Sequence, residues 1–238
     1  MFIQYHGHSC IQISNNNNSI IIDPYITGNP VAVSELQNIQ VQYVLITHGH
    51  SDHTTDAVNI AKQNKASIIA VEELTKYFSK EGINTELMHI GGQWDFEFGS
   101  VRMTHAAHGS SIIDDNGQTV YGGSPVGFLI TMDGITIYHA GDTGLFGDMK
   151  LLGKLFKIDI AFLPIGGRFT MNPGDALLAA EWLRAGYVVP IHYDTFLPIK
   201  QDGNAFVDSL LKKGIQGKAM TPGDIITIHT GSEEVRIC

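Results

Sequence analysis

The sequence predicts an α/β fold of four layers, in which two mixed β-sheets pack face to face and helices cover the outer sides. The chain opens with a β-hairpin and then alternates strands with helices. A second hairpin at residues 126–138, turned at Asp133-Gly134, starts the same order again. Both hairpins run into an aspartate, Asp23 in the first half and Asp142 in the second. We therefore interpret residues 1–238 as one pseudo-duplicated domain.

The first half begins with alternating apolar and polar side chains at residues 2–14, which predict a strand interrupted at Gly7-His8-Ser9. Four asparagines at 15–18 predict a tight turn into a buried strand that ends at Asp23. The polar, glycine-containing stretch 106–123 predicts a loop. The other expected elements are strands at 41–46, 67–71, 84–90, 94–98 and 101–105, and helices at 56–66 and 72–80.

The second half carries a clear helix start, because Asn172 is a good N-cap and Pro173 suits the first helical position. This pair predicts a helix at 173–185. The remaining expected elements are strands at 126–131, 135–138, 158–163, 187–191 and 225–229, and helices at 148–156 and 205–213.

Composition limits the classes of partner. The net charge of −9 argues against nucleic acid, which usually binds a basic face. No apolar run reaches the roughly 18 residues of a membrane span, and the N-terminus lacks a signal-peptide pattern. Cys10 and Cys238 form no disulfide framework, which fits a reducing cytoplasm. We therefore expect a cytoplasmic protein that acts on a small molecule, and a homo-oligomer stays an open alternative.

Four potential metal ligands stand within six residues, directly after the predicted strand at 41–46. Gly49 permits a sharp turn, so that His48 and His50 can converge on one ion at about 2.0–2.1 Å. Asp52 and His53 follow at the start of a helix and point elsewhere. The pattern predicts two half-sites for two neighbouring ions.

Later strands also end on metal-binding side chains, and strand ends at one sheet edge are where open α/β folds place their sites. His108 could complete the first ion, His192 the second, and Asp142 could bridge them. His105 competes with His108, because the phase of its strand is uncertain. Two divalent ions about 3.5–4 Å apart would hold a hydroxide as nucleophile. Zinc is favoured, and manganese or iron also suits these ligands.

The motifs resemble the metallo-β-lactamase fold superfamily across nearly the whole chain. Within it, the chain is similar to a bacterial group of uncharacterised metal-dependent hydrolases, itself similar to L-ascorbate-6-phosphate lactonases. The superfamily resemblance rests on the segment 48–53 together with Asp23, His108, Asp142 and His192. The finer resemblance rests on the segments 7–9, 22–29, 107–111, 138–146, 162–166, 169–171 and 189–196.

The resemblance implies one metal on His48, His50 and His108, a second on Asp52, His53 and His192, and Asp142 between them. It favours His108 over His105, because the family ligand directly precedes Gly/Ser-Ser. It gives Asp23 a supporting role beneath the ligand loop, residues 48–53. We further expect Asp52 to be catalytic, because it can orient the nucleophile as well as bind metal. Relatives carry a polar or acidic residue after Pro164-Ile-Gly166, whereas Gly167 and Arg168 follow here.

Three further side chains remain candidates for supporting the site or contacting substrate. His8 lines the site or makes a structural hydrogen bond, and His139 supports Asp142 or is merely buried. Arg168 contacts an anionic substrate or is a solvated surface residue.

The predicted function is a metal-dependent hydrolase, in which a metal-bridging hydroxide cleaves an ester, lactone or phosphoester bond of a small molecule. The bond type rests on the resemblance. A nuclease or a mononuclear iron oxidoreductase of the same fold is the alternative enzyme class. A non-catalytic binding protein is disfavoured, because the ligand set is complete.

Overall fold

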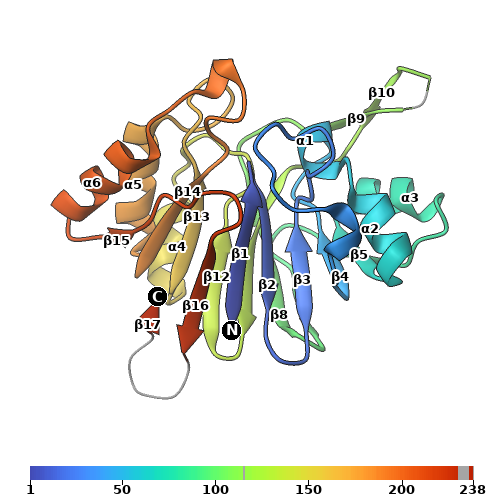
Figure 1. Cartoon of the computed structure of the whole chain (residues 1–238), viewed down its shortest axis with the longest axis horizontal. Helices are drawn as coiled ribbons and strands as arrows, with labels where there is room; N and C mark the ends of the chain where they lie inside the picture. The colour runs from blue at the N-terminus through green and yellow to red at the C-terminus, as the bar shows by residue number, and fades with distance from the viewer. Residues whose placement is uncertain (115, 230–235, 238) are drawn as a thin grey trace.

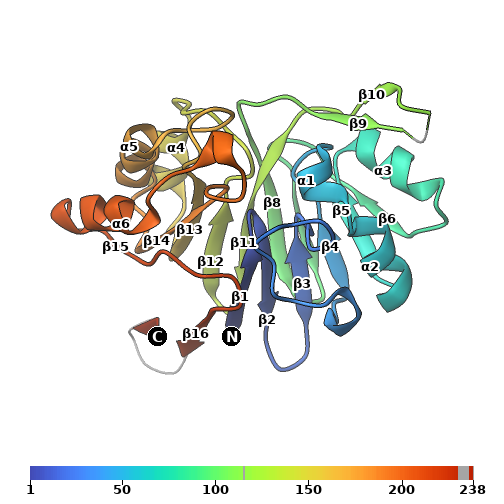
Figure 2. The ribbon, with the colours of Figure 1, turned by 45° about the horizontal axis from the view of Figure 1, so that its top comes forward.

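Two mixed β-sheets pack against each other, and helices cover their outer flanks (Figures 1 and 2). This is a computed structural model, and it describes residues 1–114, 116–229 and 236–237. The predicted α/β fold with two mixed sheets is confirmed. No helix in these ranges is long and apolar enough to cross a membrane.

The first sheet has eight strands in the order β17-β16-β1-β2-β3-β4-β5-β6. Its strands are β1 (Phe2–Gly7), β2 (Cys10–Ser14), β3 (Ser19–Ile22), β4 (Tyr43–Leu45), β5 (Ser67–Ala70), β6 (Thr85–Leu87), β16 (Ile225–His229) and β17 (Arg236–Ile237). The second has seven strands in the order β15-β14-β13-β12-β11-β8-β7. Its strands are β7 (Gln93–Phe96), β8 (Gly99–His105), β11 (Val126–Met132), β12 (Ile135–His139), β13 (Ile160–Pro164), β14 (Tyr187–Ile191) and β15 (Gln216–Gly217).

The two sheets repeat one arrangement. In the first, β1, β2 and β3 are antiparallel neighbours, and β4, β5 and β6 continue from β3 in parallel. In the second, β8, β11 and β12 are antiparallel, and β13, β14 and β15 continue from β12 in parallel. The predicted internal duplication is therefore present in the pairing pattern itself. It places Asp23 after β3 and Asp142 after β12, at corresponding strand ends.

The helices pack outside the sheets, with α2 and α3 against the first and α5 and α6 against the second. The predicted cap at Asn172 is confirmed, because its side chain accepts a hydrogen bond from the backbone N–H of Asp175. The helices are α1 (Ser51–Thr54), α2 (Ala57–Asn64), α3 (Glu72–Ser79), α4 (Met149–Leu155), α5 (Pro173–Leu183) and α6 (Gly203–Lys212), with short 3-10 helices η1 (Leu36–Asn38) and η2 (Leu197–Ile199).

The core lies in two layers that share β11. Phe128 and Ile130 of this strand enter the core between the sheets, and Leu129 enters the core beneath the helices. Alternate side chains of a strand point to opposite faces, so both faces of β11 are apolar. This explains why the strand's sequence is almost continuously hydrophobic.

Three segments differ from the sequence-based prediction. Residues 2–14 form two antiparallel strands, because Gly7 (φ 108°) and His8 (φ 57°) reverse the chain. The helix expected at 56–66 is present as α2, and a separate short helix, α1, precedes it at 51–54. The expected loop after His105 contains a hairpin of β9 (Ser111–Ile113) and β10 (Thr119–Tyr121). Its turn is held by the Asp114 carboxylate, which accepts from the N–H groups of Asn116 and Gln118.

A buried histidine on β1 makes stability depend on pH. His6 contacts Ser34 Oγ and Gln12 Oε1 through its two ring nitrogens, at 2.6 and 3.0 Å. Burial lowers the pKa of His6 in the folded chain, whereas the unfolded chain keeps the usual value of about 6.5. As the pH falls through about 6.5, the unfolded state binds the proton first and the free energy of unfolding decreases.

The variant His6→Gln is expected to lose this part of the acid destabilisation. Urea unfolding at about pH 7.5 and about pH 5.5, with the same metal load, measures it. The urea midpoint should fall less between the two pH values in the variant than in the wild type. An equal fall in both proteins would contradict the assignment to His6.

Candidate metal centre

The candidate ligands follow the ends of four strands, and the turns after those strands bring them together. His48 follows β4, His108 follows β8, Asp142 follows β12 and His192 follows β14. His50 is the N-cap residue of α1, and Asp52 and His53 lie in that helix. Side chains from both repeats therefore meet at one edge of the paired sheets.

The first group consists of His48, His50 and His108, with one ring nitrogen from each within 4.8 Å of the others. His48 Nε2 and His50 Nδ1 are 3.0 Å apart. The ring of His108 lies 5.1 Å from that of His48 and 5.2 Å from that of His50, between centroids. These are the three residues predicted to share one metal.

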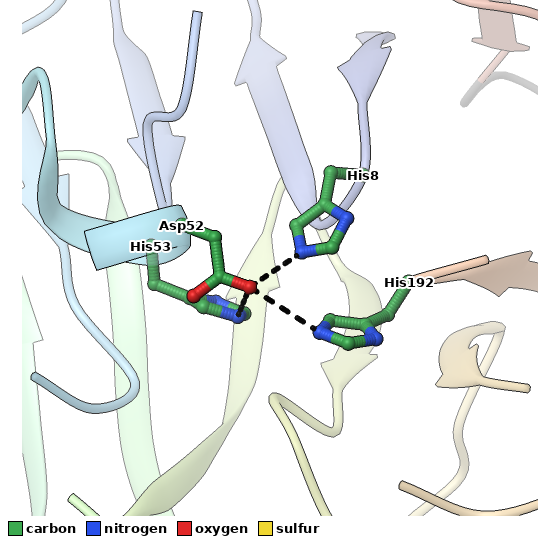
Figure 3. A group of neighbouring side chains, drawn as sticks. All are labelled: His8, Asp52, His53 and His192. Atoms are coloured by element: carbon green, nitrogen blue, oxygen red, sulfur yellow. Dashed lines mark hydrogen bonds and ion pairs between the residues drawn. The ribbon is translucent and has the colours of Figure 1, made fainter. Parts of the chain in front are cut away.

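The second group consists of His8, Asp52, His53 and His192, which point toward one another (Figure 3). Asp52 Oδ2 lies 3.7 Å from His192 Nε2 and 4.0 Å from His53 Nε2. His8 Nε2 lies 3.1 Å from the same oxygen. Asp52, His53 and His192 were predicted to share the second metal, and His8 joins them in the structure.

Asp142 lies between the two groups. Its carboxylate is 2.9 Å from His192 Nε2 and 3.4 Å from His53 Nε2, both in the second group. It is also 3.6 Å from His108 Nε2 in the first group. A carboxylate in contact with both groups is what a bridging ligand requires.

Asp23 holds the ligand loop from below and determines which ring nitrogens carry protons. Its Oδ2 accepts hydrogen bonds from Thr47 Oγ1 at 2.7 Å and from His53 Nδ1 at 2.8 Å. Because the Thr47 hydroxyl proton is engaged, Thr47 Oγ1 accepts from His48 Nδ1, 3.0 Å away. In both histidines Nδ1 is therefore engaged, and Nε2 is the nitrogen that faces the other candidate ligands.

Two buried polar atoms at the centre of the cluster fit a metal. His53 Nε2 and Asp142 Oδ1 are buried and face each other at 3.4 Å, and neither makes a hydrogen bond within the described residues. Such atoms each cost about 1–3 kcal/mol when unsatisfied. A divalent cation bound by both would satisfy them, and the mixed imidazole and carboxylate donors suit one. The residues present therefore fit the metal.

A family model described as a β-lactamase superfamily domain matches residues 2–192. The chain belongs to the metallo-β-lactamase superfamily. It is 51% identical over 228 residues to a UPF0173 metal-dependent hydrolase of Geobacillus sp. (strain WCH70), covering 96% of the chain and 100% of the relative. The UPF0173 metal-dependent hydrolase YtkL of Bacillus subtilis (strain 168) is also 51% identical, over 229 residues, with the same coverage.

A solved structure of the metallo hydrolase Igni18 from Ignicoccus hospitalis is similar with a TM-score of 0.87 and 34% identity, covering 97% of this chain and 99% of Igni18. The predicted resemblance and fold are confirmed, and the chain is a metal-dependent hydrolase.

Charges in this metallo-β-lactamase-type centre differ between the two groups. Burial lowers the pKa of His48, His50 and His108, so the first group is neutral. Burial also opposes protonation of His53 and His192, but the nearby carboxylates outweigh it. Asp142 and Asp23 raise the pKa of His53 well above its usual range, and Asp142 and Asp52 raise that of His192 to about 9.

Three site residues adopt a left-handed backbone conformation that cannot be recognised from the sequence. His8, Asp23 and His192 have φ values of 57°, 48° and 53°, each directly after a strand. Non-glycine residues in this region are strained and cluster at functional sites. The left-handed turn redirects each side chain from its strand. Sequence reasoning missed this feature, because none of these positions is a glycine.

The other candidates lie outside the two groups. His105 is exposed and packs on Phe146 at 5.2 Å between ring centroids, so the geometry selects His108. His139 Nε2 lies 2.9 Å from the backbone oxygen of Ser9, and its Nδ1 accepts from the Gly141 N–H, next to Asp142, at 3.2 Å. Arg168 is exposed and stacks on Phe169.

Gly49 is needed because the backbone of β9 passes close to it, rather than for the predicted sharp turn. A Cβ there would lie 3.0 Å from the backbone oxygen of Ser111 in β9. The variant Gly49→Ala is expected to push β9 away from the ligand loop, costing about 1–3 kcal/mol of stability. It should also weaken metal binding at the first group, measured by urea unfolding and metal titration.

The matched control is Gly109→Ala, beside His108, where an added Cβ meets nothing within 4 Å. Equal stability and metal affinity of both variants would show that the approach of β9 is unimportant.

Proposed function

We propose that this metal-dependent hydrolase is dinuclear and cleaves an ester, lactone or phosphoester bond of a small molecule. The supporting observation is the position of Asp142, whose carboxylate contacts His53 and His192 on one side and His108 on the other. One ion would be held by His48, His50 and His108, and the other by Asp52, His53 and His192. The imidazole-rich donor set favours zinc, with manganese or iron as alternatives.

When bound, divalent ions lower the pKa of water and polarise the oxygen of the scissile group. The side chains define where substrate enters. Asp52 is 28% exposed and His108 is 14% exposed, whereas His53 is completely buried. Substrate therefore approaches from the side of Asp52 and His108.

Asp52 is the candidate catalytic residue on that side. Its Oδ2 faces the second group. Burial opposes ionisation, but the His192 ring 3.7 Å away, the hydrogen bond from His8 and the charge of His53 outweigh it and hold the pKa of Asp52 far below its usual range. An ionised carboxylate here can orient the attacking water and accept a hydrogen bond from it.

The test combines metal analysis with a substrate panel. Protein purified without chelator and then reconstituted should hold two metal equivalents per chain, and it should hydrolyse lactones or esters faster than phosphodiesters or thioesters. One equivalent after reconstitution would contradict the dinuclear site. A single iron with oxygen consumption would favour the oxidoreductase, and salt-dependent oligonucleotide binding would favour the nuclease.

The proposed partner is a small-molecule substrate, with no nucleic acid or membrane involved. The proposed compartment is the cytoplasm, because the two cysteines, at positions 10 and 238, form no disulfide framework. Sedimentation of the metal-loaded protein tests whether it forms a homo-oligomer.

A further inference from the structure

His8 makes a hydrogen bond through each of its two ring nitrogens, one of them to Asp52 of the second group. Nε2 lies 3.1 Å from Asp52 Oδ2, and Nδ1 lies 2.9 Å from Thr195 Oγ1 (Figure 3 shows the first contact). The side chain is fully buried. Its ring packs against Tyr25 and Phe196, with centroids 5.7 and 5.6 Å away. The orientation of the ring is thus fixed by hydrogen bonds at both nitrogens and by aromatic neighbours.

The backbone of His8 also contacts His192, which belongs to the same group. Its carbonyl oxygen accepts a hydrogen bond from the His192 N–H at 2.8 Å and from the Tyr5 hydroxyl at 3.1 Å. His8 and His192 both have a left-handed backbone conformation, and each directly follows a strand, the two strands belonging to different sheets. One residue therefore connects Asp52, through its ring, with His192, through its carbonyl.

The hydrogen-bond partners define the protonation of the ring. An ionised carboxylate can only accept, so the proton lies on Nε2 and points at Asp52 Oδ2. The neutral ring then accepts at Nδ1 from the Thr195 hydroxyl. A metal ligand would instead direct an unprotonated nitrogen at the ion. The contact with Asp52 has hydrogen-bond geometry, which favours His8 as a donor.

We propose that His8 is a positioning residue, which holds Asp52 in the orientation needed for metal binding and hydrolysis through the chain Thr195–His8–Asp52. This inference rests on the proposed function, because it assigns Asp52 to the second metal. Groups that orient metal ligands typically change metal affinity or activity by about 10–100-fold when removed.

The test compares two variants of His8 by metal affinity. His8→Phe keeps a ring but removes the donor, and it is expected to weaken the second metal equivalent by about 10–100-fold in chelator competition. His8→Gln offers an amide N–H at similar reach and should recover most of that affinity. With an ester substrate, kcat should fall in His8→Phe while KM changes little.

Thr195→Val tests the other end of the hydrogen-bond chain Thr195–His8–Asp52, because it removes the partner of His8 Nδ1 without changing Asp52. It should weaken the second metal in the same direction by a smaller factor. The matched control is His6→Gln, a buried histidine on β1, the strand that precedes His8, whose ring partners, Ser34 and Gln12, are not candidate ligands. At about pH 7.5 it should bind both equivalents as the wild type does.

Wild-type metal affinity in His8→Phe would overturn the proposal. So would a His8→Gln variant no better than His8→Phe, which would assign His8 as a ligand instead. The metal readout separates this from failure of the proposed function. If the wild type cleaves no ester, lactone or phosphoester, the function fails, but the affinity comparison still tests His8.

Discussion

Replacing Asp142 by asparagine should remove both bound metals together and reduce kcat/KM by well over about 100-fold. Changes to groups that only orient ligands typically cost about 10–100-fold, and Asp142 contacts both ligand groups directly. The amide keeps the size of the side chain but removes the negative charge that balances His53 and His192. Metal content after gel filtration and ester kinetics measure the two effects.

The control is Asp159→Asn. Asp159 directly precedes β13, is buried, accepts a hydrogen bond from the Thr136 N–H at 2.9 Å and is not a candidate ligand. It should cost stability but keep two metal equivalents. An Asp142→Asn variant that loses only one equivalent would show that Asp142 does not bridge the ions.

The two metal equivalents are expected to bind with different dependence on pH. Without metal, His53 and His192 hold protons near neutral pH, because nearby carboxylates raise their pKa values, that of His192 to about 9. Metal binding must displace those protons, so affinity for the second group should rise with pH, by up to about 100-fold per pH unit if two protons leave. His48, His50 and His108 have lowered pKa values and release none.

Calorimetric titration in two buffers of different ionisation enthalpy measures the protons released by each equivalent. Repeating it between about pH 7 and about pH 9 gives the affinities. The first equivalent should be nearly independent of pH in this range and the second strongly dependent. Two equivalents with the same proton release would contradict the assignment of the protons to His53 and His192.

Much of the metal centre could be predicted because four of its ligands stand close together in the sequence, directly after an apolar strand. His48 to His53 follow a short apolar strand, and such a density of ionisable groups has no place in a core. The internal repeat was also visible, because the strand before Asp23 and the strand before Asp142 end similarly. The division of the ligands into two groups followed from the predicted helix start, which directs Asp52 and His53 away from His48 and His50, and the structure brings each group together.

The sequence named His8 as a candidate but left its role open, because its position depends on a left-handed turn and on partners far along the chain. Its contacts with Asp52 and Thr195 span 44 and 187 residues. The hairpin of β9 and β10 was missed for a local reason. A side chain, Asp114, holds its turn, and the surrounding residues are mostly polar and exposed. Short exposed strands bury too little apolar surface to produce a hydrophobic period.

The repeated order of strands has a consequence for how the protein matures in the cell. Synthesis releases His48, His50, Asp52 and His53 first, while Asp142 and His192 follow only with β12 and β14 of the second sheet. A nascent chain therefore exposes an incomplete set of ligands until the second repeat has left the ribosome and paired. We expect metal capture to be the last step of maturation, so that the cell's free metal concentration at that moment selects the ion that the enzyme carries.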